Sequence, residues 1–149
     1  MENILIKELN KNKLNEALSL VWKVFNEYEA PDYNKEGIEE FHKCINDTSY
    51  LATLRVFGAF EGDNLLGVIA TRNQGTHIAL FFVDGKYHRQ GIGKKLFKTV
   101  LDNNTSNKIT VNSSPYAIPV YHKLGFCDTN KEQVINGLIF TPMELKLSD

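Results

Sequence analysis

The sequence is poor in cysteine and has no marked excess of charge of either sign. Its two cysteines, Cys44 and Cys127, lack the short spacing of a metal-binding pair, so we expect reduced thiols and no metal site. The 17 basic residues against 18 acidic ones leave a net charge of −1. This balance argues against a dedicated nucleic-acid binder, because such a protein carries a basic excess.

Long apolar runs are also missing. No segment approaches the roughly 20 apolar residues that a membrane span needs, and no signal-peptide pattern follows Met1. The chain has 149 residues, of which 42% are hydrophobic, and this length matches one globular domain of roughly 150 residues. We therefore expect a single cytoplasmic domain over residues 1–149 that binds neither nucleic acid nor a membrane.

The spacing of apolar residues predicts both strands and helices. Short apolar runs indicate strands, and apolar residues that recur every three or four positions indicate helices. The expected strands cover residues 3–9, 54–60, 65–71, 76–83, 108–112 and 138–147. The expected helices cover about 11–28, a segment from the turn at 30–34 to about 47, a segment ending at 103–104, and a helix started by Pro115 that runs to Lys123. This order describes a mixed α/β sheet with helices on both faces, in which Thr76–Val83 is apolar enough to be central.

The segment from Val83 to Lys94 (VDGKYHRQGIGK) joins the expected central strand to the next helix. A glycine-bearing turn at a helix start directs several backbone N–H groups toward one point, and the helix dipole adds positive potential there. Such a turn suits a phosphate or pyrophosphate, and Gly91 and Gly93 would let it approach the backbone closely. The alternative is that the two glycines only permit a tight turn.

Two familiar nucleotide-binding patterns are not met by this turn. In a Walker A loop a serine or threonine follows Gly-Lys, whereas Lys95 stands there in this chain. A dinucleotide fingerprint needs a third glycine, and its position is occupied by Leu96.

The turn resembles the acetyl-CoA-binding motif of the GNAT superfamily of N-acetyltransferases, Gln/Arg-x-x-Gly-x-Gly/Ala. Residues 112–117 (NSSPYA) and 121–126 (YHKLGF) look like a second signature of that family, Asn-x-x-Ala followed by Tyr-x-Lys-x-Gly-Phe. The chain departs from these patterns at His88, where Gln or Arg is usual, and at Ser114, where Asn is commoner. The resemblance implies the GNAT fold: a central, mostly antiparallel sheet of about six or seven strands, splayed in the middle, with helices on both faces.

The resemblance also implies a function. It predicts an acyltransferase that moves the acetyl group of acetyl-CoA, its cosubstrate, to an amine of a small molecule or a protein, by direct attack in a ternary complex. The alternative is a non-catalytic sensor or partner domain that binds CoA or acyl-CoA. Dimers are common in the family, so a homodimer is expected. The residues that the resemblance assigns to cofactor binding are Phe81, Phe82, Val83, His88, Arg89, Gln90, Gly91, Ile92, Gly93, Lys94, Asn112 and Ser114.

The tyrosine of the second signature, Tyr121, stands where the family's tyrosine protonates the leaving thiolate. A phenol with a pKa near ~10 is a reasonable acid for a thiolate with a pKa near ~8.5. The alternative is a core aromatic residue on the expected helix.

A base is also expected, because an alkylammonium must lose a proton before it attacks. His77 is the candidate that the residues favour, since histidine titrates near neutral pH and a regular strand would put it on one face with Phe81 and Val83. The alternative is a hydrogen-bonded strand histidine that does not titrate. Three acidic residues are competing candidates for the base: Glu27, Glu29 and Asp32. They lie on a segment that lines the acceptor side in the family, so they are either substrate-binding residues or ordinary solvated charges.

Overall fold

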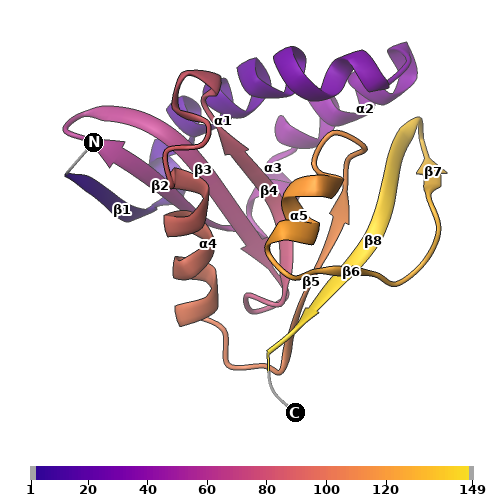
Figure 1. Cartoon of the computed structure of the whole chain (residues 1–149). Helices are drawn as coiled ribbons and strands as arrows, with labels where there is room; N and C mark the ends of the chain where they lie inside the picture. Colours follow the sequence, from indigo (N-terminus) through magenta and orange to yellow (C-terminus); the bar gives the residue numbers. More distant parts are fainter. Residues whose placement is uncertain (1–2, 148–149) are drawn as a thin grey trace.

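The computed structural model describes residues 3–147 and has the mixed α/β architecture that the sequence predicts (Figure 1). The strands are β1 (Ile4–Leu9), β2 (Arg55–Glu61), β3 (Asn64–Arg72), β4 (His77–Val83), β5 (Lys108–Ser113), β6 (Cys127–Asp128), β7 (Gln133–Ile135) and β8 (Leu138–Lys146). The α-helices are α1 (Leu14–Val24), α2 (Lys35–Ile45), α3 (Thr48–Leu51), α4 (Ile92–Asp102) and α5 (Ile118–Lys123). None of the helices between residues 3 and 147 has the length and apolar character needed to cross a bilayer.

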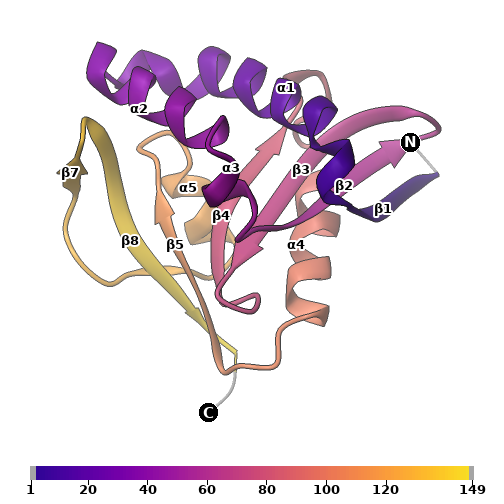
Figure 2. The same cartoon turned by 180° about the vertical axis from the view of Figure 1, so that it is seen from behind.

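The sheet is open and splayed at its centre. Its strand order is β1-β2-β3-β4-β5-β8-β6, and β7 pairs with β8 beside this path. Only the central pair, β4 and β5, is parallel, and its register covers just His77 with Thr110 and Ile78 with Val111. Beyond Ile78 the two strands diverge, which is visible as the opening between β4 and β5 in Figures 1 and 2. The expected fold is thereby confirmed, with two very short strands added at the edge.

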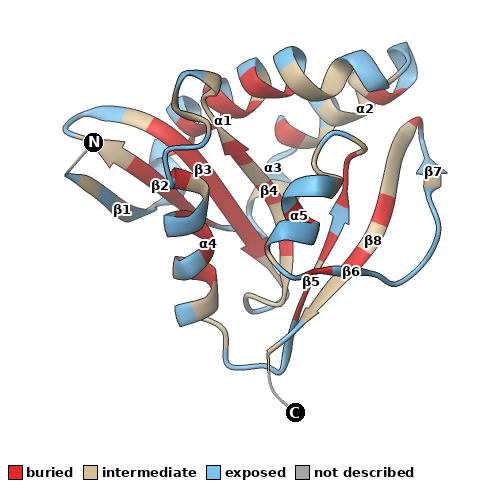
Figure 3. Ribbon diagram, viewed as in Figure 1, coloured by how far each residue is buried: buried red, intermediate tan, exposed pale blue. Residues whose placement is uncertain are grey.

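Helices cover both faces of the sheet, and each face has its own core (Figure 3). On one face α4 packs over β1–β4, with Leu96 and Val100 among its buried residues. On the other face α1 packs over β3 and β4, with Ala17 and Val21 buried. The four-residue spacing within each pair places its side chains on one side of a helix, as the sequence pattern predicts.

A bulge in β4 changes which side chains share a face. The pairing with β3 passes from Ala70–Leu80 to Thr71–Ile78, so one extra residue is inserted in β4. As a result Ile78 packs into the core under α4 although Leu80 packs into the core under α1. The expectation that His77 shares a face with Phe81 and Val83 is wrong, because a bulge shifts the alternation of side chains by one position.

Two helix boundaries also differ from expectation. The first helix changes into a π-helical turn over Phe25–Glu29, in which the Ala30 N–H donates to the carbonyl of Phe25. The last helix is not started by Pro115. It begins at Ile118, because the Ala117 N–H is bonded to the Ser114 carbonyl and hydroxyl oxygens and closes a separate turn first.

Candidate functional site

Two cavities lie beside β4 and meet at a common wall. The α2-side cavity, of about 310 Å³, is bounded by α2, β4 and the β7–β8 hairpin. The turn-side cavity, of about 420 Å³, is bounded by β4, the turn before α4, and α5. Residues that line both cavities form the junction: Glu29, Phe81, Phe82, Ala117 and Tyr121. The splay of β4 from β5 makes this space available.

The glycine turn presents backbone donors at the start of α4. Gly91 is the residue that precedes the helix and has φ +83°, a conformation that favours glycine. The first hydrogen bond of this helix end runs from Lys95 N to Gly91 O, so the N–H groups of residues 92–94 precede it. This geometry suits an anion.

Gly93 provides a test of whether a ligand fits this turn. A Cβ at Gly93 would lie 3.5 Å from Phe81 Cζ, an ordinary contact, so packing among the described residues does not require glycine there. Helical propensity does not favour it either. A ligand that approaches the backbone closely would account for glycine at this position, so the turn fits the phosphates of CoA.

The predicted cofactor-binding residues fall into three groups. Phe81, Phe82, Val83, His88, Arg89 and Gly93 line the turn-side cavity. Gln90 and Gly91 are exposed on the turn and Lys94 is exposed in the first turn of α4, whereas Ile92 is buried in the core and leaves only its backbone for a ligand. Asn112 and Ser114 line the α2-side cavity, across the junction from the glycine turn.

His88 makes a contact that the motif does not suggest. Its Nε2 lies 2.7 Å from the carbonyl oxygen of Val83 and ties the turn back to the end of β4. The next residue, Arg89, has a left-handed backbone with φ +66° and an exposed side chain on the cavity wall. His88 therefore holds the turn in place, and Arg89 is one of two cationic residues, with Lys123, that line this cavity.

Two tyrosines of the turn-side cavity were not predicted from the sequence. Tyr28 packs on Tyr116 and on His88, with ring centroids 5.3 and 4.9 Å apart, respectively. Its hydroxyl lies so close to Gly85 that a Cβ there would collide with it. The only signal in the sequence is that Tyr28 precedes Glu29 at the end of the first helix.

Tyr121 lies in α5 at the junction and is buried. Its ring is 6.2 Å from that of Phe81 and meets the ring of Phe126 edge-on at 5.3 Å. Burial, together with the charge of Glu29, raises the pKa of its hydroxyl above the ordinary value of 10.0. The phenol is therefore protonated at neutral pH and is able to donate a proton.

Glu29 ends the π-helical turn, and its carboxylate faces the junction. Burial raises its pKa from 4.5 to about 7; a hydrogen bond with Ser114 opposes this shift, and the charge of Asp32 adds to it. A carboxyl group with this pKa gains and loses a proton near neutral pH, as a general base must. Glu27 and Asp32, the other two acidic candidates, are exposed and line neither cavity.

His77 lies at the start of β4 and lines neither cavity. Its Nδ1 is 2.8 Å from Thr110 Oγ1, across the short parallel pairing of β4 with β5. Burial and the positive charge of Arg72 lower its pKa to about 4. It is therefore neutral at physiological pH, and its hydrogen bond joins the two central strands.

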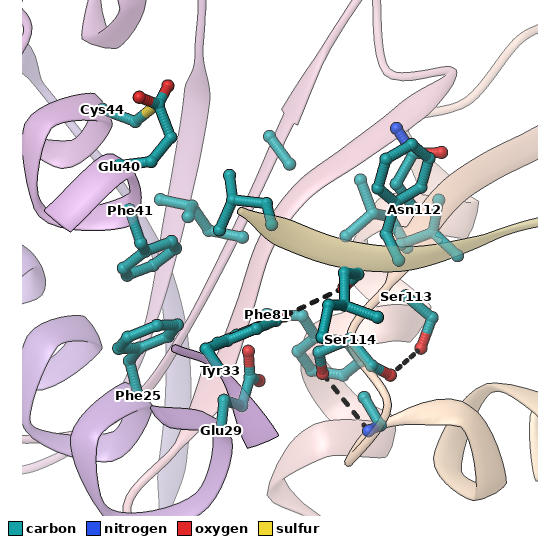
Figure 4. A pocket seen from close by; sticks show the side chains of 18 of the residues that line it. Phe25, Glu29, Tyr33, Glu40, Phe41, Cys44, Phe81, Asn112, Ser113 and Ser114 are labelled. Atoms are coloured by element: carbon teal, nitrogen blue, oxygen red, sulfur yellow. Dashed lines mark hydrogen bonds between the residues drawn. The ribbon is translucent and has the colours of Figure 1, made fainter. Parts of the chain in front are cut away.

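The α2-side cavity is walled mainly by aromatic and aliphatic side chains (Figure 4). Phe25 stacks on Phe41 with ring centroids 4.0 Å apart and planes within 9°. The Tyr33 hydroxyl donates to the carbonyl of Ile139 at 3.1 Å and attaches β8 to this wall. Among residues 3–147, no group of three or more His, Cys, Asp and Glu side chains has the arrangement of a metal site.

Comparison with family models identifies one family, and solved structures share the fold of this chain. The family model that describes the acetyltransferase (GNAT) domain matches residues 29–147 of this chain. A GCN5-related N-acetyltransferase from Rhodopseudomonas palustris is 18% identical with a TM-score of 0.83; the alignment covers 99% of this chain and 98% of that one. The PaiA N-acetyltransferase from Thermoplasma acidophilum, solved in complex with coenzyme A, is 20% identical with a TM-score of 0.72, over 97% and 99%. A GNAT family acetyltransferase from Elizabethkingia anophelis, with acetyl-CoA bound, is 19% identical with a TM-score of 0.66, over 99% and 100%. No curated protein sequence matches the chain significantly.

Proposed function

The chain belongs to the GNAT acetyltransferase family, and on that premise we propose that it acetylates an amine, with Glu29 as the base and Tyr121 as the acid. As an N-acetyltransferase of this family it takes acetyl-CoA as its cosubstrate. The observation that carries the proposal is the junction, where these two side chains face both cavities. Two substrates that enter from opposite sides of β4 would meet there.

The turn-side cavity is the place proposed for acetyl-CoA, which supplies an acetyl group as a thioester. The N–H groups of residues 92–94 would bind its pyrophosphate, and Arg89 would contribute a positive charge. Beyond Ile78 the edge of β4 is not paired with β5, so the backbone from Phe81 to Val83 is available to the rest of the molecule. This backbone would hold the acetyl group at the junction.

The α2-side cavity is the place proposed for the acceptor. The carboxylate of Glu29 would take a proton from the acceptor's ammonium and leave a neutral amine with a free electron pair. Its raised pKa suits this step, because a base is most effective when its pKa lies near the working pH. Ser114, whose side chain interacts with this carboxylate and lowers its pKa, would orient it.

Transfer then forms a bond between the amine nitrogen and the acetyl carbon and breaks the bond from that carbon to sulfur. Tyr121 would give its hydroxyl proton to the departing sulfur, and the amine loses a second proton, which restores the phenol. The position of Tyr121 on the wall of both cavities supports the assignment.

The proposal is tested by amine-dependent release of CoA thiol, with mass-spectrometric detection of the acetylated amine. The variants are Glu29→Gln and, as a matched control, Glu27→Gln, which removes an exposed charge two residues away. We expect Glu29→Gln to lower kcat by about 100-fold or more with unchanged affinity for acetyl-CoA, and Glu27→Gln to behave like the wild type. Equal loss in both variants, or in neither, contradicts the role of Glu29.

A further inference from the structure

The α2-side cavity contains a second acidic side chain, which the proposed chemistry does not use. Among the described residues that line it, the only formally charged ones are Glu29 and Glu40. Glu40 comes from α2, and its Oε2 accepts a hydrogen bond from the thiol of Cys44 at 3.5 Å. Of the two lysines of this helix, Lys35 pairs with Glu39, and neither Lys35 nor Lys43 forms an ion pair with Glu40 among the described residues. The cavity thus has two negative groups on its wall.

The wall between the two carboxylates is apolar. The stacked rings of Phe25 and Phe41 lie between Glu40 and Glu29 in Figure 4. Leu80 and Phe82 of β4 continue this surface. Moving methylene groups from water onto such a surface lowers the free energy of the complex. Aromatic ring faces also attract cations.

We propose that the acceptor is a linear aliphatic diamine, with one amine reacting at Glu29 and the second, as an ammonium, bound by Glu40. The inference rests on the proposed function, because it takes the junction as the place of reaction. A monoamine of the same length would leave the Glu40 carboxylate beside apolar groups without a cation, which costs free energy. A carboxylate on the acceptor would be repelled by both glutamates, so amino acids fit the cavity poorly.

The test compares diamines with monoamines of equal carbon number as acceptors. The variants are Glu40→Gln and, as a matched control, Glu39→Gln, since Glu39 is the adjacent exposed acid of the same helix. In the wild type and in Glu39→Gln we expect kcat/KM for the best diamine to exceed that of its monoamine about tenfold or more. In Glu40→Gln the preference disappears through a higher KM, while kcat changes little.

Calorimetric titration with the same diamine and monoamine, without turnover, gives a second readout. Tighter binding of the diamine to the wild type, lost in Glu40→Gln only, supports the inference. Equal binding and equal turnover of the two amines overturn it but leave amine acetylation intact. Binding of the diamine without acetyl transfer to any amine contradicts the proposed function and leaves the Glu40 site standing.

Discussion

Glu29 and Tyr121 both lie at the junction of the two cavities, and the charge of Glu29 helps to raise the pKa of the Tyr121 hydroxyl. Glu29 is held by a π-helical turn and Tyr121 by a short helix on the far side of the splayed strands. The two side chains therefore differ in how they hold a proton near neutral pH. The carboxyl group is ready to exchange a proton, and the phenol keeps one until it is needed.

The raised pKa of Glu29 predicts a pH-dependent cost in stability. Between pH 4.5 and about 7 the folded protein keeps a proton on Glu29 that the unfolded chain has released, so its stability falls as the pH rises through this window. Glu29→Gln removes this titration. We expect the variant to be more stable than the wild type at pH 8 by on the order of 2 kcal/mol, and the difference to vanish below pH 4.5. Thermal unfolding across this range measures it, with Glu27→Gln as the control that shows no such trend.

Tyr121→Phe tests the proton donor with little change in packing. The ring contacts with Phe81 and Phe126 persist, because only the hydroxyl is removed. We expect kcat to fall about 100-fold while calorimetric binding of acetyl-CoA stays within about twofold. Tyr116→Phe, which removes a hydroxyl from the turn-side cavity away from the junction, is expected to keep kcat within about threefold. Full turnover of Tyr121→Phe would contradict the role of Tyr121 as the proton donor.

The two glycines of the turn are expected to respond differently to alanine. Gly93→Ala meets only an ordinary contact, so its stability is unchanged or raised by up to about 1 kcal/mol, while its affinity for acetyl-CoA falls tenfold or more. Gly91→Ala forces φ +83° on alanine and loses about 1 kcal/mol of stability as well as affinity. Melting temperatures and calorimetric dissociation constants separate the two effects. Undiminished affinity in Gly93→Ala would show that the turn binds no phosphate.

His77→Asn separates the histidine from the chemistry. The residue lines neither cavity, so we expect kcat/KM and its pH dependence to stay within about twofold of the wild type. The loss of its bond to Thr110 costs about 1 kcal/mol of stability, seen in urea unfolding. A large loss of turnover at unchanged stability would instead indicate that His77 acts as the general base.

The fold and the glycine turn were predictable from the sequence because their signals are local. The alternation and helical spacing of apolar residues predicted the order of strands and helices along the chain, and the motif between Val83 and Lys94 predicted the turn before α4. The same holds for Tyr121, whose register is set by the short signature around it.

The choice of base could not be made from the sequence, because it depends on two local irregularities. The π-helical turn selects Glu29 over Glu27, since a regular helix would present its side chains at different angles. The bulge in β4 turns His77 away from the face that a regular strand predicts. Glu40 was missed for a third reason: α2 and the β7–β8 hairpin come together only in the folded chain.

The pH dependence of kcat at saturating amine and acetyl-CoA, for the wild type and Glu29→Gln, tests the central claim most directly. If Glu29 is the base, kcat of the wild type rises with pH through about 7, as the carboxyl group loses its proton. Glu29→Gln then retains only a low rate without this rise. The same rise through pH 7 in both proteins would contradict the account, because another group would then be taking the proton.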